Sequence, residues 1–364
     1  MLKKLVLCMG LATANISLAC TAIDIQSKDG VVIAGRTMEW AYDMQWQLLS
    51  LPKGTALNLT APADLKLLVI AEKTKYAVVG IGPGVIPGNT LLEGQNSEGM
   101  GMSGNFLPGF TKYQTVTAQD KNYVSILDFG TWALGNFANV AELKAALPLI
   151  KVWADSSLPS GPKPPVLHFV FTDKSNDGMI VEYVDGKLNI HANVAHTLTN
   201  APTYDWHVTN LRNYLNLSTI GATSRPVGTD NVTQLGQGSA MVGMPGDYTP
   251  PSRFVRGAFL RHYATQPANA QEATQLIGHI LNNVDIPIGI AQSKEGNDVI
   301  SDYTQFVAIK DLTNNKMYVT DYAHRLNYVA LDLNKLFAQT VATKILINAL
   351  PYPAAADATA SLMK

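Results

Sequence analysis

The sequence predicts an α+β fold, and its pattern agrees with two packed β-sheets that are covered by helices on both outer faces. Strand-like runs gather toward both ends of the chain, and segments with helical periodicity lie between and after them. Hydrophobic residues make up 47% of the 364 residues and charged residues only 15%, so the chain can bury a sizeable core and is too poor in charge for a coiled coil. Neither a repeat nor a linker interrupts it, so we expect one domain.

The first element in order is a secretory signal peptide over residues 1–19. Two lysines give it a positive start, residues 5–18 are mostly apolar, and small side chains stand at positions −3 and −1 of a cut before Cys20. The apolar run is shorter than the roughly 20 residues that span a bilayer, and no later segment reaches that length free of charges, Gly and Pro. We therefore expect a periplasmic or secreted bacterial protein with no stable membrane span.

The predicted cut makes Cys20 the first residue of the mature chain. Cys8 leaves with the signal, so no internal disulfide can form. A lipid-modified cysteine is one interpretation, although Ser17 stands where a lipidation box has Leu, and an accident of the cleavage site is another. The third is a nucleophile whose thiolate attacks while its own α-amino group, with an ordinary pKa of about 8, takes the proton.

The residues after Cys20 predict a β-hairpin, which favours the nucleophile. Residues 21–34 contain a period-2 run, an Asp-Gly turn and a second β-branched run. The hairpin would return Arg36 and Glu39 toward Cys20, where a guanidinium lowers the pKa of a thiol and a carboxylate can hold an α-ammonium group. A surface ion pair is the alternative role for these two side chains.

The remaining elements follow from hydrophobic periodicity and turn residues. Strand-like runs occupy residues 66–70, 76–81, 166–172, 179–184, 306–310 and 317–320. Helical spacing covers residues 124–137, 140–149 and 271–283. The proline-rich residues 157–165 are expected to form a surface loop, and the alanine-rich tail, residues 351–364, to be poorly ordered.

Three other kinds of site are disfavoured by the sequence. Residues 99–104 spell G-x-G-x-x-G, but residues 93–98 do not read as a buried strand and Pro108 stops a helix, so a dinucleotide site is not expected. The sequence contains neither an H-E-x-x-H motif nor a cysteine pair, so a metal site is not expected. The net charge of −1, which becomes −3 when the two signal lysines leave, gives no basic surplus for nucleic acid.

The run from Cys20 to Trp40 resembles the start of the choloylglycine hydrolase family, which contains penicillin V acylases and conjugated bile salt hydrolases. Segments 96–106, 199–214 and 252–254 continue the resemblance in order, over nearly the whole mature chain. It implies a four-layer αββα N-terminal nucleophile hydrolase sandwich of two antiparallel sheets over residues 20–350. It also implies a homotetramer that needs no cofactor.

The resemblance assigns the catalytic positions residue by residue. Cys20 matches the nucleophile, Arg36 matches the arginine that flanks the thiol, and Glu39 stands where many members have Asp. Glu keeps the negative charge of Asp and reaches one carbon further, so the resemblance implies the same role for Glu39 as the carboxylate that holds the amine. A papain-like pair of Cys20 with His207 or His196 is the alternative, but such a cysteine begins a helix, whereas Cys20 begins a strand.

Three later positions complete the implied site. Asn200 matches the asparagine whose side-chain amide donates to the oxyanion, and Asn105 matches a position whose backbone N–H completes that hole. Arg253 matches a late arginine of the charge network. Outside the matching segments Asn200 would read as a turn residue and Arg253 as a solvated loop charge. His207 is expected as a partly buried residue on the helix after Asn200.

The expected activity is hydrolysis of a linear amide through a Cys20 thioester. Four aromatic residues near the matched positions are candidates for an acyl pocket, with ordinary core packing as the alternative: Trp40, Trp46, Phe106 and Phe110. The signal resembles the periplasmic penicillin V acylase branch, which implies phenoxyacetyl or fatty-acyl amides and N-acyl homoserine lactones. Asn105 favours the alternative of a conjugated bile salt hydrolase, and a lipid-anchored binding protein with Cys20 blocked is the non-enzyme alternative.

Overall fold

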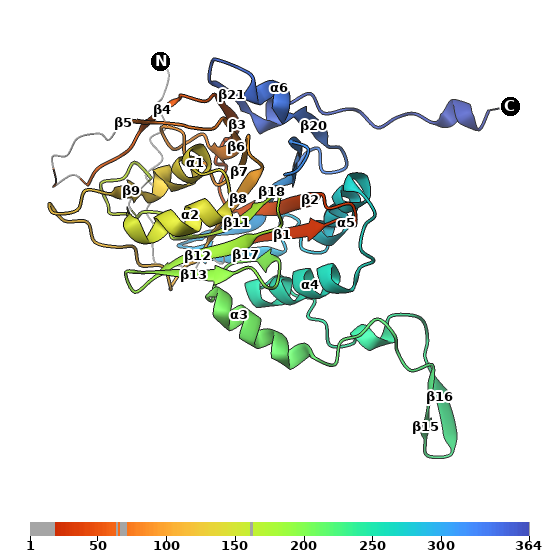
Figure 1. Ribbon diagram of the computed structural model, residues 1–364. Helices are drawn as coiled ribbons and strands as arrows, with labels where there is room; N and C mark the ends of the chain where they lie inside the picture. The colour runs from red at the N-terminus through yellow and green to blue at the C-terminus, as the bar shows by residue number, and fades with distance from the viewer. Residues whose placement is uncertain (1–18, 63–64, 66–70, 161–162, 364) are drawn as a thin grey trace.

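The computed structural model describes residues 19–62, 65, 71–160 and 163–363 (Figure 1). The predicted signal peptide, apart from Ala19, and the strand expected at residues 66–70 lie outside the described residues. Among the described residues, no helix combines the length and the apolar character that crossing a bilayer requires.

One large antiparallel sheet begins with the strand that carries Cys20. Its strands lie in the order β14–β1–β2–β18–β19–β20 along the described chain, and β17 pairs with β18. Their bounds are β1 Cys20–Gln26, β2 Val32–Trp40, β14 Thr197–Leu198, β17 Ala291–Glu295, β18 Asp298–Asp311, β19 Lys316–Asp321 and β20 Val329–Asp332. The predicted hairpin is therefore confirmed, and the strands expected at 306–310 and 317–320 lie within β18 and β19.

The second large antiparallel sheet has the order β13–β12–β11–β8–β7–β6–β3–β21. Its strands are β3 Trp46–Leu51, β6 Val78–Pro83, β7 Glu93–Asn96, β8 Met100–Phe106, β11 Leu167–Asp173, β12 Gly178–Val184, β13 Lys187–Ala192 and β21 Thr343–Leu346. Smaller pairs are β4 Ala56–Asn58 with β5 Ala71–Lys73, β9 Tyr123–Ser125 with β10 Lys151–Trp153, and β15 Ser224–Val227 with β16 Asp230–Thr233. The strands expected at 76–81, 166–172 and 179–184 correspond to β6, β11 and β12.

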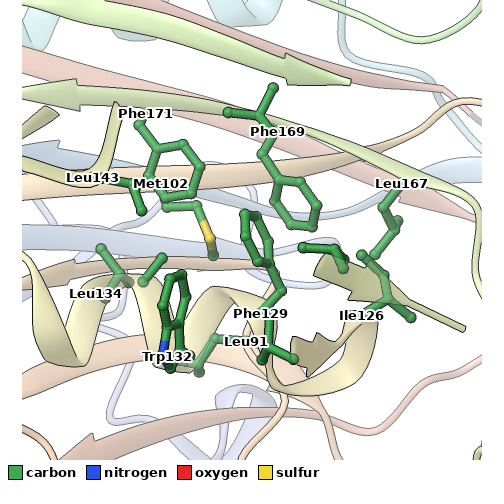
Figure 2. Close-up of a cluster of buried hydrophobic side chains, with 14 of the residues drawn as sticks. Leu91, Met102, Ile126, Phe129, Trp132, Leu134, Leu143, Leu167, Phe169 and Phe171 are labelled. Carbon is green, nitrogen blue, oxygen red and sulfur yellow. The ribbon is translucent and has the colours of Figure 1, made fainter. Parts of the chain in front are cut away.

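Helices cover the outer faces of both sheets, which confirms the four-layer αββα arrangement (Figure 1). The helices are α1 Ile126–Asn136, α2 Val140–Ala146, α3 Tyr204–Asn210, α4 Pro250–Tyr263, α5 Ala270–Asn282 and α6 Leu333–Phe337. Phe129 of α1 packs on Phe169 of β11 at a ring distance of 4.8 Å, within the cluster that Figure 2 shows. On the other face, Ile277 of α5 belongs to a cluster with Ile23 and Ile33.

Local signals explain the hairpin and the start of α5. Gly30 has φ +87°, a left-handed conformation that glycine adopts without strain, and its N–H donates to the Ser27 carbonyl at 3.0 Å. Asn269 caps α5 by accepting from the N–H of Glu272, whose carboxylate in turn accepts from Ala268 N at 2.7 Å. The first of these hydrogen bonds caps the helix and the second holds the residue before the cap, so α5 begins close to the predicted start at residue 271.

The prediction that residues 93–98 contain no buried strand is wrong. Strand β7 is buried throughout, although it consists of polar residues and Gly94. Burial is possible because Glu93 accepts hydrogen bonds from Lys310 Nζ of the opposite sheet and from Ser103 Oγ, the latter at 2.6 Å. The glycine motif runs into strand β8 rather than into a helix, so the dinucleotide site remains excluded.

Two segments project from the layered body (Figure 1). The first, which we call the arm, is the hairpin of β15 and β16, whose residues are all exposed. The second is the tail after residue 350, which is exposed over most of its length and contains the short 3₁₀ turn Thr359–Ser361. Residues 157–160 and 163–165 contain no helix or strand.

Candidate active site

Cys20 lies at the first position of β1, where antiparallel pairing places it opposite Met38 of β2. Its side chain is buried, with Sγ 3.7 Å from the Met38 sulfur and 3.9 Å from the carbonyl oxygen of Glu39. Burial raises the pKa of the Cys20 thiol above its usual range, whereas Arg36 and Arg253 act to lower it. The expected lowering by Arg36 is therefore present but outweighed in the chain that still carries Ala19.

The nitrogen of Cys20 is held by Asn200, which follows β14. Cys20 N donates to Asn200 Oδ1 at 2.6 Å, and Arg253 Nη2 donates to the same oxygen at 2.8 Å. The amide of Asn200 donates to the Phe106 carbonyl at 2.9 Å, which uses one of its two hydrogens. Asn200 is fully buried, so this geometry fixes the side chain next to the sulfur-bearing residue.

Arg253 connects α4 to the start of β1. Its Nη1 donates to the carbonyl oxygen of Cys20 at 2.6 Å and to Thr21 Oγ1 at 2.7 Å, and its Nε donates to the Tyr248 carbonyl at 3.0 Å. The side chain is fully buried on a helix that begins with Pro250, rather than solvated on a loop. Burial lowers the pKa of Arg253 to about 10, with Glu39 opposing, so the guanidinium is charged at neutral pH.

Arg36 lies between the two sheets. Its Nη1 donates to the carbonyl oxygens of Leu92 at 2.8 Å and Gly104 at 3.0 Å, and its Nη2 lies 3.4 Å from the Met38 sulfur. Its Nε is 3.8 Å from Glu93 Oε2, so both charges are buried and paired. Arg36 is therefore no surface ion-pair residue, and Met38 lies in contact with both the guanidinium and the thiol.

Glu39 does not make the hydrogen bond that we expected to the nitrogen of Cys20. The register of β2 and β18 places Glu39 opposite Thr304, whose hydroxyl donates to Glu39 Oε1 at 2.6 Å. The other oxygen, Oε2, is buried without a hydrogen-bond partner among the described residues. Burial raises the pKa of Glu39 to about 7, with Arg253 opposing. Asn200 takes the place next to the nitrogen that we predicted for Glu39.

Asn105 is near the end of β8 and is fully buried. Its side-chain amide donates to the carbonyl oxygens of Leu198 at 3.2 Å and Thr199 at 2.8 Å. The side chain therefore ties the second sheet to the segment that precedes Asn200. This contact is additional to the backbone N–H role that the resemblance implies.

The structure brings together two of the four pocket candidates. Trp40 and Phe106 pack edge to face at a ring distance of 5.4 Å, and the Phe106 carbonyl accepts from Asn200. Trp46 instead packs on Phe306 at 5.2 Å in the buried core, and Phe110 lies beyond the end of β8 with 41% of its surface exposed. Trp46 thus serves the core, as the alternative interpretation held.

Periodicity alone missed several polar groups around the site. Asp302 of β18 is buried, and burial raises its pKa to about 7, with Arg253 opposing. His207 is fully rather than partly buried on α3, where burial lowers its pKa to about 4. His168 and Glu182 are buried in β11 and β12. The sequence could have indicated His168 and Glu182, because each is a charged or imidazole side chain inside an otherwise apolar run that is typical of a strand.

Neither histidine of the papain-like alternative contacts Cys20 among the described residues. His207 Nε2 lies 2.9 Å from the Asn200 carbonyl, and His196 Nδ1 pairs with Asp24. Over the same residues, no group of three or more His, Cys, Asp or Glu side chains is placed to hold a metal ion. The arrangement therefore offers a buried thiol, a fixed amide and two guanidinium groups.

Comparison with known families decides which chemistry this arrangement serves. A family model described as "Linear amide C-N hydrolases, choloylglycine hydrolase family" matches residues 20–345. The chain belongs to this family. It is accordingly an amidohydrolase that acts on linear amides, and its fold is that of the N-terminal nucleophile hydrolases.

Individual members show how the similarity is distributed. A bile salt hydrolase/transferase of Clostridium perfringens is 33% identical over 323 residues, which cover 87% of this chain and 93% of that protein. A penicillin V acylase of Pectobacterium atrosepticum is 28% identical over 199 residues, which cover 53% and 52% of the two chains. The choloylglycine hydrolase family thus relates this chain to both kinds of enzyme.

Solved structures give the same relationship in three dimensions. A variant of the conjugated bile acid hydrolase of Clostridium perfringens has a TM-score of 0.78 at 30% identity, over 90% of this chain and 97% of the other. The penicillin V acylase of Agrobacterium tumefaciens has a TM-score of 0.70 at 23% identity, over 90% and 91%. At this lower identity, the similarity to the penicillin V acylase supports the fold only.

Proposed function

We propose that the mature amidohydrolase begins at Cys20 and cleaves its substrate through a thioester on that residue. The hydrogen bond between Cys20 N and Asn200 Oδ1 carries this proposal, because it fixes the nitrogen that becomes the α-amine next to the side chain that we assign to the oxyanion. The sulfur attacks the amide carbon while the α-amino group takes the thiol proton and passes it to the departing amine. Water then attacks the thioester, the same group takes a proton from the water and returns it to the sulfur, and the acid leaves.

Four further residues support this reaction in the proposal. The side-chain amide of Asn200 and the backbone N–H of Asn105 donate to the oxyanion of each tetrahedral intermediate. Arg36 and Arg253 favour the thiolate electrostatically, because both act to lower the pKa of Cys20 against the raising effect of burial. Every step uses groups of the chain and water, so the mechanism requires no cofactor.

Removal of the leader completes the site in this account. Cys20 and Ala19 are both buried, with 2% and 3% of their surfaces exposed. Cleavage between them would turn the peptide nitrogen of Cys20 into an amine and would uncover the thiol. We place this maturation during export, so that the enzyme acts in the periplasm or outside the cell. The small residues before the cut and the apolar run of the leader support that location.

For the substrate, we propose a phenoxyacetyl or fatty-acyl amide, as in penicillin V or an N-acyl homoserine lactone. The edge-to-face pair of Trp40 and Phe106 supports an apolar acyl group, because Phe106 directly adjoins Asn200. A conjugated bile salt is the second candidate. It is favoured by Asn105 and by the greater identity to the bile salt hydrolase/transferase of Clostridium perfringens than to the penicillin V acylase of Pectobacterium atrosepticum.

We also propose a homotetramer, with the arm as a contact between protomers. The arm and the segments that flank it expose apolar side chains, among them Val227, Val232 and Leu235. Such side chains on a projecting hairpin favour burial against another surface. Light scattering on the purified protein tests this: a mass of four chains is expected, and a monomer would contradict it.

Release of primary amine from three substrates tests the proposed activity. Penicillin V, a long-chain acyl homoserine lactone and glycocholate are supplied in turn to the wild type and to Cys20→Ala. Release from either of the first two that requires Cys20, with little from glycocholate, is the expected result. Preference for glycocholate would establish the second candidate, and release that persists in Cys20→Ala would contradict the thiol mechanism.

A further inference from the structure

Polar side chains from three neighbouring strands form a buried row behind Asn200. The register pairs Asn105 of β8 with His168 of β11, and the pairing of Phe169 with Val181 brings Glu182 of β12 next to His168. Asn105, His168 and Glu182 each expose 1% of their surface or less. The row belongs to the second sheet, whereas Cys20 is in the first, so it reaches across the layer between them.

The row ends on the carbonyl oxygen of Thr199. This oxygen accepts from His168 Nε2 at 3.0 Å and from Asn105 Nδ2 at 2.8 Å. A carbonyl cannot donate, so His168 Nε2 carries a hydrogen. His168 Nδ1 lies 2.9 Å from Glu182 Oε1, and the same oxygen accepts from Tyr204 N at 3.0 Å. The carboxyl group therefore fixes the ring orientation from behind.

A second buried imidazole holds the other side of Asn200. His207 Nε2 lies 2.9 Å from the carbonyl oxygen of Asn200, so this nitrogen also carries a hydrogen. His207 Nδ1 is buried without a partner among the described residues, which is consistent with a neutral ring. The ring stacks on Phe254 of α4 at 4.6 Å and an interplanar angle of 13°. Its position is therefore set by packing rather than by an acid.

The two contacts fall on the two peptide groups that meet at the Cα of Asn200. The Thr199 carbonyl belongs to the peptide before that atom, and the Asn200 carbonyl belongs to the peptide after it. Fixing both planes fixes the φ and ψ angles of Asn200 and so the direction of its side chain. A donor aimed at an oxyanion must hold its place closely, because a displacement of about 1 Å can cost roughly 100-fold in rate.

We propose that His168 and His207 are positioning residues that aim the Asn200 amide at the oxyanion, with Glu182 orienting His168. The inference rests on the proposed oxyanion role of Asn200. Neither imidazole acts on the substrate, and neither exchanges a proton during turnover. Their hydrogen bonds to backbone carbonyls instead set the geometry of the residue that does contact the reacting atoms.

Two amide substitutions at His168 separate positioning from simple packing. The amide nitrogen of Gln reaches about as far as Nε2, whereas that of Asn reaches only as far as Nδ1. His168→Asn should lower kcat by roughly 10- to 100-fold with KM within about twofold, and His168→Gln should restore most of the loss. His207→Asn and His207→Gln should differ in the same direction. Equal losses in the Gln and Asn variants, at matched melting temperatures, would overturn the proposal.

A double-mutant cycle separates this inference from the proposed role of Asn200. It uses whichever of penicillin V, the acyl homoserine lactone and glycocholate the wild type hydrolyses fastest. His168→Asn should add little to the loss in Asn200→Ala, because both act through one amide. Full activity in Asn200→Ala would overturn the oxyanion role itself. A loss there without any in His168→Asn would overturn only the inference.

A spectroscopic readout does not depend on turnover at all. Nitrogen-15 spectra of the histidine rings should show a protonated Nε2 for both His168 and His207 at pH 7. Glu182→Gln should disturb the His168 signals and leave those of His207 in place. An unprotonated Nε2 on either ring would overturn the hydrogen bonds on which the proposal stands.

Discussion

The nitrogen of Cys20 and the side-chain oxygen of Asn200 lie 2.6 Å apart although the two residues are 180 positions apart in the chain. Strand pairing brings them together, because β14, which ends just before Asn200, pairs with β1 through Ala22 and Leu198. Arg253 of α4 donates to both residues. The candidate site therefore forms only when β1, β14 and α4 have docked, so its geometry depends on the tertiary structure and not on any one segment.

Replacing the sulfur of Cys20 tests its chemical role. Cys20→Ser should keep the fold, because the hydroxyl is close in size to the thiol and can donate to the Glu39 carbonyl oxygen, which lies 3.9 Å from the sulfur; the free energy of unfolding should fall by no more than about 3 kcal/mol. Its kcat should fall by about a thousandfold or more, because the thiolate is lost. Amine-release assays and thermal unfolding measure the two effects, and full activity in the serine variant would exclude a thiol-specific role.

Substitution of Asn200 tests the oxyanion donor. Asn200→Asp keeps an oxygen for Cys20 N and Arg253 but removes the amide donor, so kcat should fall by about 10²- to 10³-fold. KM should change far less, because the donor acts on charge that develops during the reaction. Steady-state kinetics on the preferred amide measure both constants. A raised KM at unchanged kcat would mean that Asn200 binds the ground state instead.

Arg253 and Arg256 form a matched pair on α4. Arg253→Met leaves the Cys20 carbonyl, the Thr21 hydroxyl and the Asn200 oxygen without their buried donor, so it should cost about 3–5 kcal/mol of stability and most of the activity.

The control, Arg256→Met, removes donors from the carbonyls of Pro245, Asp247 and Asn283, away from Cys20. It should cost about 1–3 kcal/mol and leave kcat of the folded enzyme unchanged. Chemical unfolding and kinetics on both variants give the comparison. An equal loss of kcat in both would show that α4 acts through general stability alone.

The buried carboxyl of Glu39 gives a pH dependence of stability. Burial raises its pKa from the ordinary 4.5 to about 7, so between these values the folded chain binds more protons than the unfolded chain. The stability that this group contributes is complete below pH 4.5 and is lost as the pH rises through 7. Glu39→Gln should therefore lose less stability than the wild type between pH 4.5 and 7. Chemical unfolding at a series of pH values measures this, and the same change in the free energy of unfolding with pH in both proteins would contradict a buried protonated Glu39.

Local signals were sufficient for the hairpin, for α5 and for the class of fold. The turn glycine Gly30 and the capping pair of Asn269 and Glu272 act over a few residues, so they are visible in the sequence. Strand β7 was not visible in the sequence, because Glu93 can be buried only with partners that are distant in the chain, among them Lys310, 217 positions away on the other sheet, and Arg36. Such a pairing exists only after the sheets have packed.

The same limit applied within the site. Resemblance supplied Cys20 and Asn200 as candidates, and the hairpin explained why Arg36 and Glu39 return toward the thiol. The sequence could not show that the side chain of Glu39 faces Thr304, since that contact depends on the register between β2 and β18. Nor could it show the imidazoles behind Asn200, which come from a strand of the opposite sheet and from α3.

The most direct test of the account is the mass of the mature enzyme before and during turnover. We predict that the secreted protein begins at Cys20 and carries an unmodified thiol. When the reaction is quenched during turnover, the mass of the trapped enzyme should be larger by one acyl group, and peptide mapping should locate that group on Cys20. A mature chain that carries a diacylglyceryl group, or that retains residues 1–19 while active, would contradict the account. So would an acyl group found on any residue other than Cys20.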